Sequence, residues 1–258
     1  MRFCSLGSGS GGNATLIEAS QGITSTQVLV DCGFSLRELT RRLLRAGTAP
    51  SALTAVFITH EHGDHAGCAL ALARQHRVPI VTSRGTWRAI GQADFDPLLL
   101  RFARDDEALA LGDIELQPFA VPHDANEPLQ VRAADGQHRF GMITDIGSVT
   151  PCIVQSLQGC DALLLECNHD EDMLRASSYP HGLKRRILGS HGHLSNDSAA
   201  HLLRQCLHPG LQQVVAAHLS VRNNTPGLAA AAVAGVLGIT ADEVAVASQH
   251  EGIGWQAL

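Results

Sequence analysis

Four side chains able to bind metal stand within six residues of one another, at His60, His62, Asp64 and His65. A helix presents metal-binding histidines at positions i and i+4, whereas the first two histidines here are spaced i and i+2. That spacing needs an extended loop, and we expect Gly63 to give the loop its freedom. His60 and His62 can then face one metal ion while Asp64 and His65 face a second, about 3.5–4 Å away. The alternative, a solvated turn that is rich in histidine by chance, does not explain so dense a set of ligands.

The rest of the chain repeats one pattern, an apolar run that stops at a polar side chain able to bind metal. Such runs are typical of strands buried on both faces. They cover residues 27–30, 55–59, 114–122, 139–144, 162–165 and 213–217, and the residues that follow them are Asp31, His60, His123–Asp124, Asp145, Glu166 and His218. Helical patterns span residues 36–46, 67–75, 195–206 and 227–235. Strands that deliver polar groups at one end predict a site along one edge of a sheet sandwich covered by helices.

Composition narrows the class of protein further. No linker, repeat or low-complexity tract divides the 258 residues, which predicts one domain over residues 1–258. No apolar run reaches the ~18–20 residues that span a bilayer, and residues 1–13 lack the apolar core of a signal peptide, so we expect a cytoplasmic protein. The net charge of −6 argues against a broad basic surface for nucleic acid, but not against a local cationic site. The seven cysteines lack paired spacing and are predicted to be free, buried thiols.

The order of the ligands resembles the metallo-β-lactamase superfamily. The resemblance implies an α/β (α+β) fold, the four-layer αβ/βα sandwich, with a dinuclear metal site at the edge between its two sheets. Carried over by motif, the ligands of the first ion are His60, His62 and His123, those of the second are Asp64, His65 and His218, and Asp145 bridges both. The same resemblance lets Asp64 orient the nucleophile and Asp31 orient the ligand loop. Capping or turn-forming roles at the strand ends are the alternatives for Asp31, His123, Asp145 and His218.

Other segments resemble the YycJ/WalJ family within this superfamily. They are residues 3–15, 121–125, 165–170, 179–180, 183–187, 192–196 and 218–226. The resemblance implies an exonuclease that degrades double-stranded DNA from 5′ to 3′ and serves DNA repair, so DNA is the expected partner. Residues 128–131 depart from the Gly-Tyr pair of the family pattern, which predicts a reshaped substrate rim.

Several residues are candidates for contact with the substrate. His193 is expected to hold the phosphate or to protonate the leaving group, with a capping role as the alternative. Ser195 and Asn196 begin a predicted helix whose N-terminal amides can bind phosphate. Lys184 and Arg185 belong to a basic triplet that can contact the DNA backbone, although a short basic run is also a common solvated surface.

Three other kinds of function compete with the nuclease. A metallohydrolase for a small molecule, such as a cyclic phosphodiester, thioester or lactone, is favoured by an aromatic content of only 4%, because binders of single strands stack bases on aromatic rings. A non-catalytic metal protein is disfavoured because every ligand position is filled, and a redox di-iron site is disfavoured by His62, where such members have an acidic ligand. Histidine and carboxylate ligands suit two divalent ions, Zn²⁺, Mn²⁺ or Fe alike, and the sequence leaves the oligomeric state open.

Overall fold

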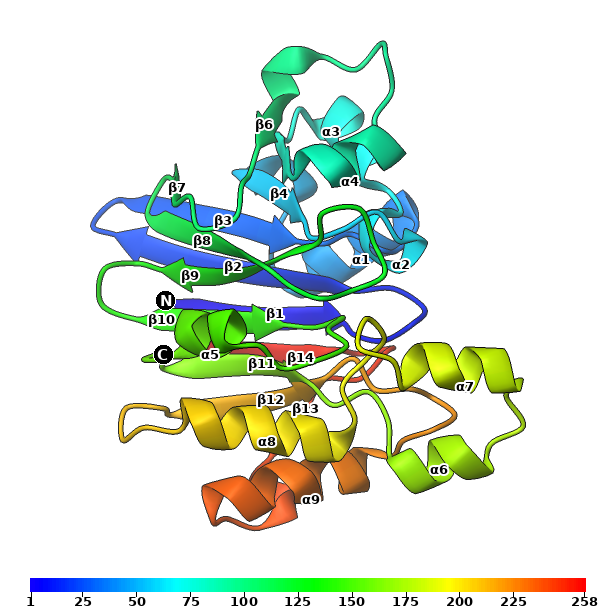
Figure 1. Cartoon of the computed structure of the whole chain (residues 1–258). Helices are drawn as coiled ribbons and strands as arrows, with labels where there is room; N and C mark the ends of the chain where they lie inside the picture. Colours follow the sequence, from blue (N-terminus) through cyan, green and yellow to red (C-terminus); the bar gives the residue numbers. More distant parts are fainter.

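Two seven-stranded sheets pack face to face in the computed structural model, which describes residues 1–258 (Figure 1). The first sheet has the strand order β14-β1-β2-β3-β4-β5-β6, and its strands are β1 Arg2–Gly7, β2 Ala14–Gln21, β3 Thr24–Val30, β4 Ala55–Ile58, β5 Ile80–Thr82, β6 Leu100–Phe102 and β14 Ile253–Ala257. The second sheet has the order β13-β12-β11-β10-β9-β8-β7, and its strands are β7 Leu109–Leu111, β8 Ile114–Ala120, β9 Leu129–Ala134, β10 Arg139–Ile143, β11 Ala162–Glu166, β12 Gln213–Ala217 and β13 Ala245–Val246.

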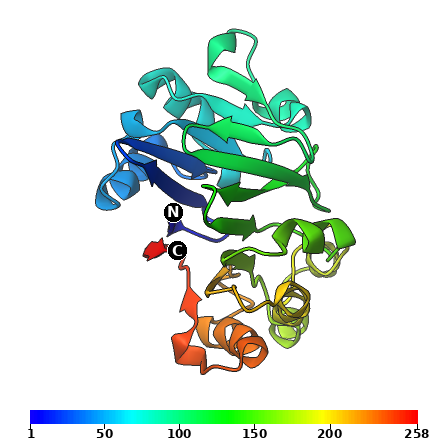
Figure 2. The same ribbon diagram turned by 90° about the vertical axis from the view of Figure 1, so that its left-hand side faces the viewer.

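Helices cover the outer face of each sheet and make the fold a four-layer α/β sandwich (Figure 2). They are α1 Leu36–Arg45, α2 Gly63–Ala66, α3 Ala69–His76, α4 Arg84–Ile90, α5 Pro151–Leu157, α6 Glu171–Ala176, α7 His181–Ile187, α8 Asn196–Cys206 and α9 Pro226–Leu237. Leu39 of α1 and Leu72 of α3 pack on the first sheet. Leu202 of α8 and Val233 of α9 pack on the second. The layered fold predicted from the sequence is confirmed.

The strands are apolar on both faces because each face has a partner. In β3, Val28 and Val30 point into the layer between the sheets, while Leu29 points into the layer beneath the helices, as the two-residue period of a strand requires. Phe3 and Phe140 stack across the inner layer, with ring centroids 4.1 Å apart. The continuous apolar runs of the sequence follow from this double burial.

The strand directions explain where the polar strand ends meet. β3 runs parallel to β4 in the first sheet, and β10, β11 and β12 run parallel to one another in the second. β8 runs in the same direction as β10, because β8 is antiparallel to β9 and β9 is antiparallel to β10. The carboxyl ends of these strands lie at the edge of the sandwich where α2 and α7 are drawn (Figure 1).

Some local predictions are wrong. The helix expected over residues 67–75 is α3, which begins at Ala69 and ends at His76, and a short helix that was not predicted, α2, precedes it over Gly63–Ala66. Only His60 to His62 therefore lie in a loop, whereas Asp64 and His65 lie on α2. Gly63 occupies an ordinary helical position with open space where a Cβ would stand, so the loop does not need its conformational freedom. All seven cysteines are free, but Cys152 is exposed while the others are buried. No helix has the length and apolar character needed to cross a membrane.

Candidate metal centre

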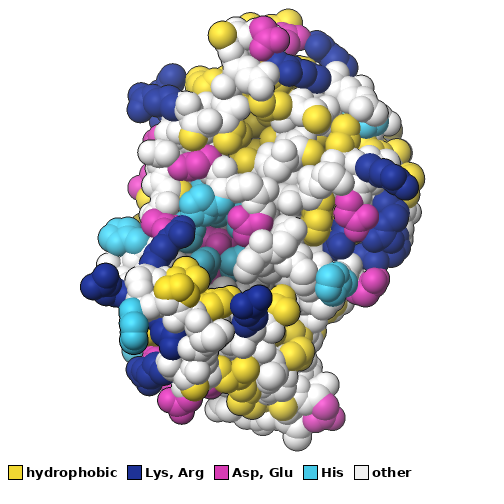
Figure 3. All heavy atoms as spheres, turned by 90° about the vertical axis from the view of Figure 1, so that its right-hand side faces the viewer, with side chains coloured by type: hydrophobic (Ala, Val, Ile, Leu, Met, Phe, Trp, Pro, Cys, Tyr) yellow, Lys and Arg dark blue, Asp and Glu magenta, His cyan; other side chains and the backbone are white.

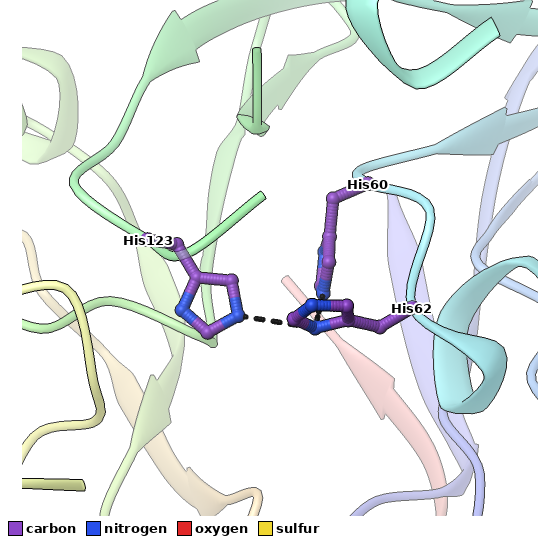
Figure 4. A group of neighbouring side chains, drawn as sticks. All are labelled: His60, His62 and His123. Atoms are coloured by element: carbon purple, nitrogen blue, oxygen red, sulfur yellow. Dashed lines mark hydrogen bonds between the residues drawn. The ribbon is translucent and has the colours of Figure 1, made fainter. Parts of the chain in front are cut away.

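Three histidines from two strand ends converge on one point (Figure 4). His60 and His62 follow β4, and His123 follows β8. The Nδ1 atom of His62 lies 3.1 Å from His60 Nε2 and 3.4 Å from His123 Nε2. A tetrahedral zinc ion with bonds of ~2.0–2.1 Å separates its nitrogen ligands by roughly 3.3–3.4 Å. The spacing of this group therefore fits a divalent metal ion.

A second group lies beside the first and mixes one carboxylate with two histidines. Asp64 Oδ2 is 3.6 Å from His65 Nε2 and 3.9 Å from His218 Nε2. His218 Nε2 is buried and makes no hydrogen bond. A buried polar atom without a partner is costly, and a metal ion among these three side chains would satisfy it.

Asp145 stands between the two groups. Its Oδ2 lies 3.0 Å from His65 Nε2, and its Oδ1 lies 3.5 Å from His218 Nε2 and 4.0 Å from His123 Nε2. One carboxylate thus reaches nitrogens of both groups. This is the position of a residue that can ligate two ions at once.

Asp31 lies behind this centre and orients it. The side chain is fully buried, and its Oδ2 is 2.8 Å from His65 Nδ1 while its Oδ1 accepts a hydrogen bond from the Thr59 amide at 2.9 Å. With Nδ1 held in this way, Nε2 of His65 faces Asp145. The side-chain amide of Asn13 also lies 3.0 Å from that nitrogen. This amide donates to the backbone oxygens of Gly9 and Asp64 as well, so it would still have hydrogen-bond partners if a metal ion took the nitrogen of His65.

Glu166 is the central residue that the sequence analysis did not assign. It ends β11, is fully buried, and its Oε1 lies 2.8 Å from His193 Nδ1 and 3.0 Å from His218 Nδ1. Its Oε2 accepts hydrogen bonds from the amides of Ile146 and Leu194 at 3.0 and 3.2 Å. The signal was present, since Glu166 follows an apolar run in the same pattern as the predicted ligands.

Three of these strand-end residues adopt a left-handed backbone conformation. The φ angle is 63° at Asp31, 55° at Asp145 and 55° at His218. Asp and His tolerate this region better than most side chains, but each such residue still costs about 1–3 kcal/mol. The chain turns sharply at each strand end, and the side chain enters the centre instead of continuing the alternation of the strand.

The electrostatics of the metal-free centre depend on its carboxylates. Burial lowers the pKa of His60 well below its usual value, with the neighbouring His65 adding to the effect. Burial opposes protonation of His218 as well, yet the charge of Asp145, the nearby Asp64 carboxylate and the hydrogen bond to Glu166 raise its pKa to about 10. The pKa of Asp145 is held well below its usual range, because His218 and His65 outweigh the effect of burial. The centre without metal therefore holds protons that a cation can replace.

A cavity of about 210 Å³ opens beside the centre, next to His193. In Figure 3 histidine and acidic side chains gather in a hollow, with Lys or Arg and hydrophobic side chains on its rim. Of the basic triplet, Arg186 lines this cavity, and its Nε forms an ion pair with Asp124. Lys184 and Arg185 do not line it, and Lys184 Nζ donates to the backbone oxygen of Arg175.

Ser195 and Asn196 are nearby but form hydrogen bonds within the protein. Ser195 caps α8 by accepting a hydrogen bond from the Ser198 amide at 3.2 Å. The Asn196 amide donates to the backbone oxygen of His169, and its side chain exchanges two hydrogen bonds with Asn224. Neither residue lines the cavity, so the geometry gives both a structural role.

The layered architecture and the histidine–carboxylate centre together define a protein of the metallo-β-lactamase class, and comparisons of the fold agree with the architecture. The metallo-β-lactamase fold protein YhfI from Bacillus subtilis superposes with a TM-score of 0.75 at 17% identity, covering 99% of both chains. Zinc-bound PqqB from Methylobacterium extorquens gives a TM-score of 0.72 at 15% identity, covering 100% of both chains. A model described as the beta-lactamase superfamily domain matches residues 26–219.

Closer relatives specify the family. The exodeoxyribonuclease WalJ of Streptococcus pneumoniae is 33% identical over 232 residues, which is 88% of this chain and 85% of the relative. The exodeoxyribonuclease YycJ of Bacillus anthracis is 33% identical over 241 residues, 92% of this chain and 89% of the relative. The chain therefore belongs to the YycJ/WalJ family of the metallo-β-lactamase superfamily and is a metal-dependent hydrolase.

Proposed function

We propose that this protein is a two-metal exonuclease that hydrolyses the phosphodiester bonds of DNA from 5′ ends. The observation that carries the proposal is the placing of Asp145, whose two oxygens reach nitrogens of both ligand groups. Two relatives named exodeoxyribonucleases, each aligned over most of this chain, give the substrate class. A cytoplasmic location and a part in DNA repair are predictions that accompany this proposal.

The proposed ligands form two sets joined by one carboxylate. His60, His62 and His123 would hold the first ion, Asp64, His65 and His218 would hold the second, and Asp145 would contribute to both sets. Imidazole and carboxylate donors suit Zn²⁺, Mn²⁺ or Fe. Two bound divalent ions would polarise the phosphoryl oxygens and lower the pKa of water at the site.

Residues of the chain itself orient the attacking water, protonate the leaving oxygen and bind the substrate phosphate. Asp64, the partly exposed member of the second ligand set, orients the attacking water. Glu166 and Asp145 raise the pKa of His193 against the opposing effect of burial, which favours the protonated form of this histidine. With Nδ1 of His193 held by Glu166, its Nε2 can give a proton to the departing 3′ oxygen. Arg186, positioned by Asp124, leaves its two terminal nitrogens for a substrate phosphate.

The test uses protein loaded with Mn²⁺ or Zn²⁺ and end-labelled duplex DNA, single-stranded DNA and RNA, with Asp64→Ala as the inactive control. Stepwise loss of nucleotides from 5′ ends of DNA, absent in Asp64→Ala, is the expected result. Release from 3′ ends would overturn the polarity. No cleavage of any polymer, with hydrolysis of bis(p-nitrophenyl) phosphate retained, would assign the centre to a small substrate instead.

A further inference from the structure

We propose that the cavity beside His193 binds the nucleoside at the end of the DNA strand, with Tyr179 stacking on its base. This inference rests on the proposed function and adds a substrate subsite to it. The cavity lies between the segment that carries α6 and α7 and the loops that carry His193 and Ser220. It is therefore adjacent to the metal centre but is built from residues that do not belong to either ligand set.

One wall of the cavity has the character of a base-binding surface. Tyr179 is the only tyrosine of the chain and is partly exposed at the cavity. Leu183 and Ile187 lie one helical turn apart on α7, and both are partly buried against the same space. The Arg222 guanidinium is 5.9 Å from the Tyr179 ring centroid. An aromatic ring beside two aliphatic side chains can stack on any base, because every base has a π face.

Other residues that line the cavity are polar and suit a sugar. Asn168, Ser220 and His193 line it, and Asn168 is fixed because its amide donates to the backbone oxygen of His218 at 3.0 Å. His193 therefore joins the cavity to the metal centre through Glu166, which also contacts His218. A nucleoside bound here places its base on the apolar wall and its sugar at His193.

The size of the cavity limits what it can hold. Its volume of about 210 Å³ lies below the ~300–1,000 Å³ of most small-molecule pockets. That is room for one base and sugar, not for a run of polymer. The nucleotide in the cavity supplies the leaving 3′ oxygen: water adds to phosphorus and loses a proton to solvent, the P–O3′ bond breaks, and His193 gives its proton to O3′. Each cut would then release one nucleotide.

The first experiment compares Tyr179→Ala with wild type on duplexes that end in a normal nucleotide or in an abasic one. Base stacking predicts that Tyr179→Ala lowers kcat/KM about 5- to 150-fold on normal ends and only slightly on abasic ends. Tyr179→Phe keeps the aromatic ring and should therefore retain the kcat/KM of the wild type on normal ends. Leu188→Ala is the matched control, because Leu188 follows α7 but is 43% exposed and does not line the cavity. Equal losses on both ends, or no loss, would overturn the assignment.

A second measurement separates this subsite from the choice of polymer. Deoxyadenosine 5′-monophosphate should inhibit hydrolysis of bis(p-nitrophenyl) phosphate by the metal-loaded wild type and Leu188→Ala proteins, and inhibit Tyr179→Ala at least 5-fold more weakly. This result would support the subsite even if no DNA were degraded, in which case only the proposed function fails. Absent or equal inhibition in all three proteins would refute the subsite while leaving the nuclease activity to its own test.

Discussion

Replacement of Glu166 by glutamine changes one atom of a carboxylate that accepts four hydrogen bonds. The donors are His193 and His218 on Oε1 and the amides of Ile146 and Leu194 on Oε2. An amide group has one acceptor oxygen and one NH₂ group, so either orientation turns the NH₂ group toward two N–H donors. If His218 changes tautomer to accept from that NH₂ group, its Nε2 gains a proton and can no longer bind metal.

The magnitude follows from the charge on the lost acceptor. A hydrogen bond to a charged group contributes about 1.5–3 kcal/mol, and each ~1.36 kcal/mol lost from transition-state stabilisation is a factor of ten in rate. Loss of the bond to His193 therefore predicts that Glu166→Gln lowers kcat about 10- to 150-fold at saturating metal. Loss of the bond to His218 predicts a fall in metal affinity of about 10- to 100-fold.

The assay measures kcat on end-labelled duplex DNA at saturating metal, and metal content after dialysis. Glu115→Gln is the matched control, because Glu115 is exposed on β8, away from the centre. His193→Ala combined with Glu166→Gln should be no slower than the slower single variant at saturating metal. Retention of both kcat and metal by Glu166→Gln would refute the reasoning, and so would full additivity with His193→Ala.

Three further predictions address separate parts of the centre. His193→Ala should lower kcat about 10²- to 10⁴-fold while two ions per chain remain bound, and full occupancy with unchanged turnover would contradict its role. Arg186→Ala should raise the KM for DNA and weaken the dependence of KM on salt concentration. Arg204→Ala, on the exposed side of α8, should change neither quantity. Equal effects of the two substitutions would show that Arg186 does not contact the substrate. Because the pKa of His218 is about 10 without metal, metal binding at pH 7 should release protons, and the metal affinity should rise with pH. Calorimetry in buffers of different ionisation enthalpy measures the number of protons released. A metal affinity that does not change with pH would contradict this prediction.

Much of the centre could be predicted because its residues end parallel strands. Asp31, His123 and His218 are far apart in the chain, but each directly follows or closely follows an apolar run, and the carboxyl ends of parallel strands share one edge of a sheet. The two sheets then bring their edges together because both bury a common apolar layer. The apolar runs therefore predict both the fold and the sheet edge at which these side chains come together.

Other features depend on contacts that no local pattern encodes. The shared hydrogen bonds of Glu166 require two histidines from different loops to reach one carboxylate oxygen. Asn196 appeared free to bind phosphate, yet its partner Asn224 lies 28 residues further along the chain. The left-handed turns at Asp145 and His218 are stabilised by the surrounding structure and not by their own conformational preferences.

The cavity was also beyond sequence reasoning. α6 and α7 have six and seven residues, too few for a reliable apolar period. Which arginine of residues 184–186 faces the substrate depends on how α7 packs against the loop of Asp124. The ion pair between Arg186 and Asp124 decides this in the folded protein.

The most direct test of the central claim compares one duplex in two forms, covalently closed as a circle and linear with two ends. The metal-loaded protein is mixed with each form, and the rate of nucleotide release and the integrity of the circle are measured beside Asp64→Ala. The proposed exonuclease predicts steady degradation of the linear form, an intact circle, and no activity in Asp64→Ala. Nicking of the circle as fast as degradation of the linear form, or degradation that persists in Asp64→Ala, would contradict a metal-dependent exonuclease acting at DNA ends.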